Sequence, residues 1–339
     1  MKAISLSDTT SISNLELIDR PVPEPKPGEV LVKLHASSIN YRDVLIAIGG
    51  YGSRQKKRDL IPLSDGAGEI VSVGGKLKKL KVGDRVLASF FQSWVSGELT
   101  EAILDDDLGR SSDGVLTQYR CFREEGLVKI PNYLSFEEAA SLPCAALTAW
   151  SGIVELGCTK PGQTVLIQGT GGVSLFAMQF ALMAGASVIV TSSSDQKIET
   201  LNKMGIKKTI NYKKIPEWGL KVLEITNGKG VDHVMEVGGA GTLKQSIRSI
   251  KPGGFISIVG VLDGAKSNLL IPLIGSRQIR LQGVTVGSVE NLKSMLIAME
   301  NHKIKPIIDK VFKLNEAIDA YEYLKSGKHF GKICLSHDL

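Results

Sequence analysis

The glycine-rich run Val165-Leu-Ile-Gln-Gly-Thr-Gly-Gly-Val-Ser174 joins an apolar strand to three closely spaced glycines. Gly169 can make a tight turn, and Gly171 lets the backbone approach a pyrophosphate at the N-terminus of the next helix. The spacing is G-x-G-x-x-S, and Ser174 stands where a dinucleotide fingerprint usually has Gly or Ala, a small residue that allows close helix-strand packing. The run therefore predicts dinucleotide binding by Gly169, Thr170, Gly171, Gly172 and Val173; the alternative is an ordinary glycine turn.

The residues on both sides of this turn supply the strand-helix-strand setting that the fingerprint requires. Residues 176–184 are rich in helix formers, Gly185 interrupts them, and residues 187–191 form a second β-rich run. Strands and helices then continue to alternate, which is typical of a parallel sheet with crossover helices. The expected strands are 165–168, 188–191, 209–212, 231–237 and 254–260; helices are expected at 290–302 and 315–325, and a closing strand at 332–336.

The N-terminal part of the chain has a different pattern of apolar residues. Short apolar runs at residues 30–35, 66–75 and 83–87 are separated by proline and glycine, including the proline-rich stretch 21–28. Evenly interrupted strands of this kind indicate an all-β barrel.

The composition restricts the class of protein. With 339 residues, 43% hydrophobic and 22% charged, the chain is long enough for two globular domains. No run reaches about 18 apolar residues and the N-terminus lacks a signal-peptide core, so we expect a cytoplasmic protein without membrane contact. The four cysteines have no C-x-x-C spacing, which suits reduced thiols.

The net charge of +6 raises the question of nucleic acid. The basic residues are dispersed apart from residues 54–58 and 76–81, which solvated loops explain better than a nucleic-acid surface. No basic-aromatic strip is present. We therefore expect no nucleic-acid partner, although a basic rim would attract a phosphorylated cofactor.

Several further motifs occur in a characteristic order. They are Pro27-Gly-Glu-Val-Leu-Val32, Asn40-Tyr-Arg-Asp43, Ser64-Asp-Gly-Ala-Gly-Glu-Ile70, Gly83-Asp-Arg-Val86, Leu142-Pro-Cys-Ala-Ala-Leu-Thr-Ala-Trp150 and His329-Phe-Gly-Lys-Ile333. With the glycine turn, they resemble the medium-chain dehydrogenase/reductase superfamily, especially its zinc-free quinone oxidoreductases and zinc-alcohol-dehydrogenase-like proteins. The resemblance covers essentially the whole chain.

This resemblance implies an α/β fold of two domains. A GroES-like β-barrel catalytic domain is expected at residues 1–125 and 288–339. A Rossmann domain with a doubly wound parallel sheet is expected at residues 126–287.

The resemblance also bears on zinc. The catalytic zinc ligands of the alcohol dehydrogenases fall on Asn40, Ser64 and Cys144, with the acidic neighbour at Asp65, so only one ligand is retained. Amide and hydroxyl oxygens are poor substitutes for thiolate and imidazole. The stretch 91–119, which corresponds to the structural-zinc lobe, contains no cysteine. We therefore expect no metal.

The second Rossmann strand is followed by Ser192-Ser-Ser-Asp-Gln-Lys197. An NAD enzyme would place an acidic residue at the strand end, where the resemblance puts Ser192. A neutral residue leaves room for a 2′-phosphate, which Ser192, Ser193, Ser194 and Lys197 can bind, so NADP(H) is the expected cofactor. Asp195 opposes this interpretation if it turns inward. Capping of a helix by Ser194 or Asp195 is compatible with either cofactor.

Three further cofactor contacts are implied by the resemblance. Tyr212 resembles a tyrosine beside the adenosine phosphate, or is a half-buried strand aromatic. Lys332 matches a basic residue near the pyrophosphate, or is a surface lysine. Thr148 matches a threonine beneath the nicotinamide, or is simply buried in a helix.

The resemblance places Asn40, Tyr41, Tyr51 and Asp65 at the substrate pocket. Asn40 can donate a hydrogen bond to a carbonyl oxygen, and Tyr51 can donate or relay a proton. Alternatively, Asn40 caps a helix and Arg42 pairs with a carboxylate. Asp65 is more readily a structural partner than a base, and the product proton can come from water.

The function expected from these features is zinc-independent, NADPH-dependent hydride transfer to a quinone or an α,β-unsaturated carbonyl. The first alternative is an NADP-dependent alcohol dehydrogenase acting on an unusual substrate. A remote alternative is a dinucleotide-binding protein that recognises RNA or a protein partner. The expected partner is a small-molecule electron acceptor, and a homodimer is the family expectation, through a strand near residues 279–286.

Overall fold

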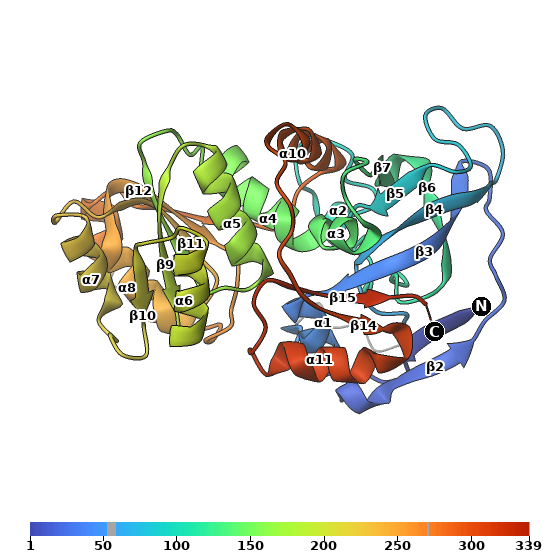
Figure 1. Cartoon of the computed structure of the whole chain (residues 1–339), viewed down its shortest axis with the longest axis horizontal. Helices are drawn as coiled ribbons and strands as arrows, with labels where there is room; N and C mark the ends of the chain where they lie inside the picture. Colours follow the sequence, from blue (N-terminus) through green and yellow to red (C-terminus); the bar gives the residue numbers. More distant parts are fainter. Residues whose placement is uncertain (53–58, 270, 339) are drawn as a thin grey trace. The chain divides into compact units, whose positions relative to one another are not determined.

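The structure is a computed structural model that describes residues 1–52, 59–269 and 271–338. The basic run 54–58 lies outside the described residues. The chain divides into two compact units: Met1–Leu147 with Val286–Leu339, and Thr148–Thr285 (Figure 1). The expected α/β fold class, a GroES-like domain with a Rossmann domain, is confirmed.

The first unit is built around a seven-stranded sheet in the order β14-β15-β3-β4-β5-β7, with β6 paired to β3. Its pairs are antiparallel except for β14 with β15. A second sheet pairs β1 with β2. The strands are β1 (Lys2–Leu6), β2 (Leu15–Asp19), β3 (Glu29–Ile39), β4 (Asp65–Val73), β5 (Arg85–Ala88), β6 (Tyr119–Arg123), β7 (Leu127–Lys129), β14 (Ile308–Lys313) and β15 (Lys332–Ser336).

Short helices complete the first unit. They are η1 (Ile12–Asn14), α1 (Tyr41–Ala47), α2 (Glu101–Leu104), η3 (Glu124–Gly126), α3 (Phe136–Ala140), η4 (Leu142–Ala146), α10 (Val289–His302), η6 (Leu314–Glu316) and α11 (Ala317–Lys325). β3 is the central strand because one edge pairs with β4 and the other with both β6 and β15. Its apolar residues join one buried core with Tyr321 of α11.

The second unit contains six parallel strands in the order β10-β9-β8-β11-β12-β13. They are β8 (Thr164–Gln168), β9 (Ser187–Ser192), β10 (Thr209–Asn211), β11 (Val231–Glu236), β12 (Ile250–Ile258) and β13 (Arg280–Gly283). In chain order this is the arrangement 3-2-1-4-5-6 of doubly wound dinucleotide-binding folds, which bind ligands where the carboxyl ends of the first and fourth strands meet. Here those strands are β8 and β11.

The crossover helices of the second unit flank this sheet (Figure 1). They are α5 (Gly172–Met183), α6 (Asp195–Lys203), α7 (Trp218–Ile225) and α8 (Ala240–Ser249); α4 (Leu147–Trp150) and η5 (Ser151–Leu156) precede the sheet, and α9 (Ile271–Ser276) precedes β13. Because crossovers are right-handed, α5 and α6 cover one face, while α7 and α8 cover the other. Leu166, Val234 and Ile256 form the apolar centre.

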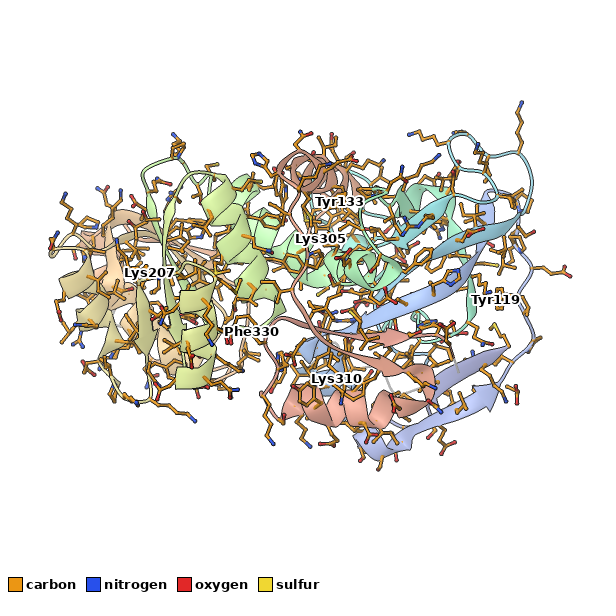
Figure 2. All side chains as sticks on the ribbon, viewed as in Figure 1. Tyr119, Tyr133, Lys207, Lys305, Lys310 and Phe330 are labelled. Carbon is orange, nitrogen blue, oxygen red and sulfur yellow. The ribbon has the colours of Figure 1, made fainter. Side chains whose placement is uncertain are left out.

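The first domain boundary lies later than expected. Residues 126–147 belong to the first unit, because β7 pairs with β5 and the Tyr133 hydroxyl donates to Ile304 O at 2.9 Å. Lys305 also pairs with Glu138 at 3.2 Å, and Figure 2 labels Tyr133 and Lys305 within this unit. The return boundary, after Thr285, differs from the expected one by two residues.

The structure bears on two features considered from the composition, the cysteines and membrane-spanning helices. All four cysteines are free, with Cys334 buried and Cys158 exposed. Among the described residues, no helix combines the length and apolar character needed to cross a membrane.

Candidate active site

The glycine turn follows β8 and leads into α5, as the sequence predicts. Gly169 has a φ of +74°, in the left-handed region that favours glycine, and its N–H donates to Thr191 O at 2.9 Å. Gly171 is the N-cap of α5, and no side chain caps this helix. The first N–H groups of a helix have no partner within it, so Gly172 and Val173 begin α5 with donors available to an anion.

Ser174 explains how the turn departs from the usual fingerprint. Its hydroxyl donates to Gln168 O at 2.7 Å, and its side chain is buried. The small side chain therefore ties the first turn of α5 back to the end of β8. This contact serves the close helix-strand packing for which the third glycine is otherwise used.

A buried polar network lies beside this turn, at the carboxyl ends of β8 and β11. Glu236 accepts hydrogen bonds from Gly238 N and Gly239 N, both at 2.9 Å, and from Gln168 Nε2 at 2.7 Å. The hydroxyls of Thr242 and Ser246 also donate to its carboxylate. The network fixes the loop after β11 at the crevice, and the sequence analysis missed it. The available signal was the polar residue that ends each of two apolar strands.

Two serine hydroxyls at the end of β9 accept hydrogen bonds from backbone N–H groups of their own segment. Ser192 is 1% exposed, and its hydroxyl oxygen accepts from Ser194 N at 3.3 Å. Ser194 caps α6, since its hydroxyl oxygen accepts from Lys197 N at 3.4 Å. Ser193 and Lys197 are half-buried. Capping by Ser194 is thus present, and phosphate binding by this run remains a prediction.

The side chain of Asp195 is held by the neighbouring strand end. Its carboxylate pairs with Lys214 Nζ at 2.7 Å and accepts from Asn211 Nδ2 at 2.8 Å. The Lys214 contact is the main cause of the lowered pKa of Asp195. Lys214, which the sequence analysis did not name, balances the acidic charge that argued against NADP(H). The signal was two consecutive lysines, Lys213 and Lys214, one residue beyond the end of β10.

Two other predicted cofactor residues lie in the second unit. Tyr212 directly follows β10, is 38% exposed, and its N–H donates to Ser192 O at 3.0 Å. Thr148 lies in α4 and is buried. Their proposed contacts with the cofactor remain predictions.

Lys332 and Asn40 form the centre of a buried cluster in the first unit. Lys332 Nζ donates to Asn40 Oδ1 at 2.6 Å and to Ile39 O at 2.9 Å. Lys332 is 3% exposed, so the alternative of a surface lysine was wrong. Asn40 is the N-cap residue of α1, but its carboxamide oxygen is directed to Lys332 rather than to the helix. The approach of Lys332 to the pyrophosphate of the cofactor remains a prediction.

Asp65 lies in the same cluster. It accepts from the Ser64 hydroxyl at 2.6 Å and from Cys144 N at 3.2 Å. Burial raises the pKa of the Asp65 carboxyl, while the positive charge of Lys332 opposes this rise. Burial, with the Asp65 charge, also raises the pKa of the Cys144 thiol well above its usual range. Asp65 is therefore engaged by neighbouring protein groups, and its role at a substrate remains a prediction.

Arg42 and Asp43 support the start of α1. The Asp43 carboxylate accepts from Asn40 N at 2.8 Å and pairs with Arg42 at 3.4 Å. Arg42 also pairs with Asp107, whose carboxylate accepts from Arg110 Nε at 2.9 Å. Burial raises the pKa of Asp43 to about 6, although the Arg42 charge limits the rise. A carboxylate partner for Arg42 was expected from the sequence, whereas the second arginine, Arg110, was not.

The two predicted tyrosines differ in their environment. Tyr41, the first residue of α1, is 39% exposed. Tyr51 is half-buried, packs on the core of the first unit, and lies with its ring 5.5 Å from the Arg42 guanidinium carbon. The structure therefore brings Tyr51 next to the Asn40 helix.

The side chains at the zinc-ligand positions do not form a zinc site. The Asn40 oxygen accepts from an ammonium group and the Ser64 hydroxyl donates to Asp65, so both side chains are engaged by other protein groups. In the described part of the chain, no group of three or more His, Cys, Asp or Glu side chains is arranged to hold a metal ion. A catalytic zinc needs three strong protein ligands, which this donor set does not supply.

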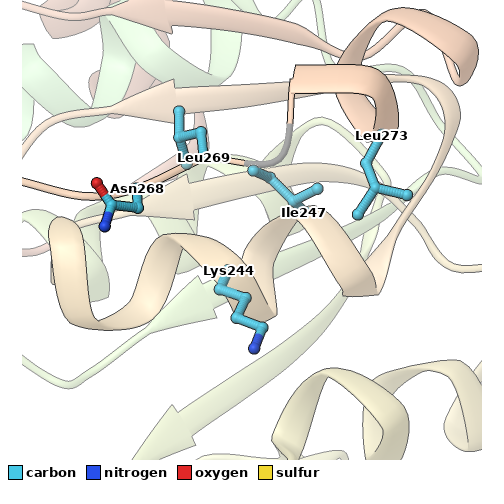
Figure 3. A pocket seen from close by; sticks show the side chains of 5 residues that line it. All are labelled: Lys244, Ile247, Asn268, Leu269 and Leu273. Atoms are coloured by element: carbon cyan, nitrogen blue, oxygen red, sulfur yellow. The ribbon is translucent and has the colours of Figure 1, made fainter.

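The second unit also contains a pocket beside α8, lined by Lys244, Ile247, Asn268, Leu269 and Leu273 (Figure 3). Three of these five residues are aliphatic. The candidate site residues named above do not line this pocket, which therefore adds nothing to the active site.

Comparisons with known proteins agree with the division into two units. The alcohol dehydrogenase GroES-like domain matches residues 26–132. The zinc-binding dehydrogenase domain matches residues 172–301.

Individual relatives match nearly the full length. The zinc-type alcohol dehydrogenase-like protein C1773.06c of Schizosaccharomyces pombe is 45% identical over 92% of each chain. The 2-methylene-furan-3-one reductase of Solanum lycopersicum is 32% identical over 99% of this chain and 79% of its own. A structure of a putative alcohol dehydrogenase from Sinorhizobium meliloti 1021 has a TM-score of 0.89 at 35% identity and covers 99% of both chains. A structure of an NAD-dependent alcohol dehydrogenase has a TM-score of 0.90 at 31% identity and covers 100% of both.

These matches extend through both units and agree with the glycine turn, the strand order and the motifs around Asn40 and Asp65. The chain is therefore an oxidoreductase that belongs to the medium-chain dehydrogenase/reductase superfamily.

Proposed function

We propose that this protein is a zinc-independent, NADPH-dependent oxidoreductase that transfers hydride to a quinone or an α,β-unsaturated carbonyl. The observation that carries the proposal is the hydrogen bond from Lys332 Nζ to Asn40 Oδ1. Asn40 stands at a position where the zinc-dependent relatives have a metal ligand, and here its oxygen accepts from an ammonium group instead. Without a Lewis acid to lower the pKa of an alcohol, oxidation of a simple alcohol is difficult. Electron-poor acceptors do not need that assistance, since positioning and a dry site suffice.

The contacts at the ends of β9 and β10 support NADPH over NADH. Asp195 would repel a 2′-phosphate, but Lys214 balances its charge and Asn211 holds its carboxylate. Ser193, Ser194 and Lys197 lie on the same segment and offer neutral or positive groups. An NAD enzyme would instead have an acidic side chain at the end of β9, where this chain has Ser192.

The residues of the chain have distinct roles in this proposal. NADPH, when bound, supplies the hydride. Gly169, Gly171 and the first turn of α5 bind the pyrophosphate through backbone N–H groups. Asn40 donates a hydrogen bond from Nδ2 to the carbonyl oxygen of the acceptor, Tyr51 contributes to the pocket, and water delivers the final proton. The similarity to the 2-methylene-furan-3-one reductase of tomato supports an acceptor of the enone type.

The test is NADPH oxidation measured against a panel of quinones, enals and ketones, with and without a chelator. We expect turnover of a quinone or an enone that chelation leaves unchanged, and NADH as a poorer donor. Elemental analysis of the same preparation provides a separate check. Stoichiometric zinc, or activity that the chelator abolishes, would contradict the metal-free mechanism.

An NADP-dependent alcohol dehydrogenase is the second candidate, supported by the similarity to the alcohol dehydrogenase-like proteins of fission yeast and Sinorhizobium meliloti. It predicts NADP⁺ reduction by an alcohol in the presence of the chelator. The two candidates are distinguished by which substrate gives the higher kcat/KM.

We also propose that the protein is a homodimer. β13 is the edge strand of the parallel sheet, and Arg280, Gln282 and Gly283 on it are exposed. An exposed edge strand can pair with the same strand of a second copy across a two-fold axis. Sedimentation equilibrium should give twice the chain mass, whereas a monomer at micromolar concentration would refute the proposal.

A further inference from the structure

Lys332 is a buried cation whose position is fixed by two acceptors. Its ammonium donates to the Asn40 side chain and to Ile39 O, and it lies on β15, which pairs with the end of β3 next to Asn40. Burying a lysine is costly unless its charge is compensated. The buried positive groups Arg42, Arg110 and Lys332 are balanced by the buried acids Asp43, Asp65 and Asp107.

The contact with Lys332 determines which way the Asn40 carboxamide points. An ammonium group can only donate, so the amide atom facing it must be the oxygen. Rotation of the amide by half a turn would place Nδ2 against the positive charge and remove the hydrogen bond. Lys332 therefore holds Asn40 with its N–H donors directed away from β15.

Asn40 Nδ2 has hydrogen-bonding capacity that the described residues do not use. Asn40 is 9% exposed, and its Nδ2 atom is buried without a hydrogen bond of normal length to the residues that the structure describes. The Asn40 side chain does lie near the Asp65 carboxyl, where it opposes the rise in the pKa of that group. An amide nitrogen carries two hydrogens, so one remains for a ligand even where the other is directed to Asp65. Because buried polar groups in native proteins are nearly always paired, this free donor next to a fixed cation indicates a ligand. The ligand atom that matches an N–H donor backed by a positive charge is an oxygen on which negative charge develops.

We propose that Lys332 is a positioning residue that orients the Asn40 carboxamide toward the oxygen of the acceptor and stabilises the negative charge forming there. This rests on the proposed function. When hydride adds to the acceptor carbon, the π electrons move to the carbonyl or quinone oxygen, giving an enolate or hydroquinone anion. A proton from water then completes the reduced product. Asn40 donates to the oxygen throughout, and the Lys332 charge acts through Asn40.

Lys332 acts in two ways, by orienting the Asn40 carboxamide and by its positive charge, and substitutions at positions 332 and 40 test the two effects separately. Lys332→Arg retains charge and donors, Lys332→Gln retains a shorter neutral donor, and Lys332→Met removes both. Asn40→Asp retains an acceptor for Lys332 but loses the Nδ2 donor. Lys328→Met, an exposed lysine on the preceding loop, is the matched control.

The first measurement is NADPH oxidation with 1,4-naphthoquinone, together with the Kd for NADPH and the thermal midpoint. We expect kcat to fall roughly 100-fold in Lys332→Met and in Asn40→Asp, the loss typical for removal of one oxyanion donor. Lys332→Arg should recover part of the loss and Lys332→Gln less. The NADPH Kd should stay within about twofold. Weakened NADPH binding with unchanged kcat in Lys332→Met would overturn the proposal and favour a pyrophosphate contact.

The second measurement does not depend on turnover. 4-Nitrophenol, whose phenol and phenolate absorb separately, is titrated in complex with the NADP⁺-loaded protein. The bound phenol should ionise at a pH higher by roughly 1 unit in Lys332→Met than in the parent, because a nearby positive charge favours the anion. Equal titration in both proteins, or no binding of the probe to the parent, would overturn the proposal. A parent that stabilises the bound phenolate but reduces no quinone or enone would instead refute only the proposed function.

Discussion

Lys214 Nζ lies 2.7 Å from Asp195 Oδ2, joining the end of β10 to the first residue of α6. Asn211 Nδ2 also donates to the Asp195 carboxylate, so both contacts direct this carboxylate toward the residues around the end of β10. This pair converts the one acidic residue of the serine segment into a neutral ion pair. Under the proposed preference for NADPH, residues at two strand ends contribute to cofactor choice, and not residues 192–197 alone.

Replacement of Lys214 tests this relationship. Lys214→Ala should weaken NADPH binding by roughly fivefold to tenfold and leave NADH binding nearly unchanged, because the released Asp195 charge repels only the 2′-phosphate. Fluorescence titration with both cofactors measures the effect. Lys203→Ala, which breaks the exposed pair with Glu199 in α6, is the control. Equal weakening of both cofactors would show that Lys214 does not act on the 2′-phosphate.

The glycine turn can be tested without disturbing the fold. Gly171 has φ −78° and ψ −178°, an extended conformation open to any residue, so Gly171→Val should leave the thermal midpoint near that of the parent. NADPH binding should be lost, because a side chain here prevents close approach of the pyrophosphate. Gly162 in the same unit has a positive φ of +82°, so Gly162→Ala introduces backbone strain and should destabilise by about 1 kcal/mol while retaining cofactor binding. Tight NADPH binding by Gly171→Val would place the cradle elsewhere.

His233 should make the second unit sensitive to acid. Burial, aided by the Arg280 charge, lowers its pKa from 6.5 to about 3, and its ring is held by Ser257 at 2.9 Å and Thr159 at 3.3 Å. The unfolded chain takes up a proton below pH 6.5 and the folded chain does not, so stability falls as pH falls through this window, by about 1.4 kcal/mol per pH unit.

In His233→Gln, urea unfolding followed from pH 6.5 downwards should show a shallower loss of stability by that amount. The exposed His302→Gln serves as the control. An unchanged slope in His233→Gln would mean that His233 does not remain neutral in the folded protein.

The Arg42–Asp107–Arg110 network should be important for stability. Asp107 accepts hydrogen bonds from both guanidinium groups, and all three residues are buried. Asp107→Asn leaves two buried positive charges without their common anion and should cost about 3 to 5 kcal/mol in urea unfolding. Disruption of the exposed Lys2–Asp19 pair by Lys2→Ala should cost no more than about 1 kcal/mol. Similar losses in the two variants would show that the buried network contributes little.

The sequence predicted the local elements of the second unit well, because its strands are continuous apolar runs and its turns are marked by glycine. The strands at β8, β9 and β11 and the helix after the glycine turn were predicted within a few residues. The domain boundary was less accurate. β7 and α3 carry no signal that assigns them to the first sheet, and only the pairing of β7 with β5 does so.

The candidate site shows the same division. The sequence by itself determined the glycine turn and the serine segment, since each depends on residue type and local spacing, while the family resemblance placed Asn40 and Ser64 at the positions of zinc ligands. Tertiary structure alone decided that Lys332, 292 residues from Asn40, bonds to its carboxamide, and that Lys214 balances Asp195. These contacts form because β15 pairs with β3 and β10 pairs with β9. Such long-range strand pairing brings together side chains whose relation no local pattern records.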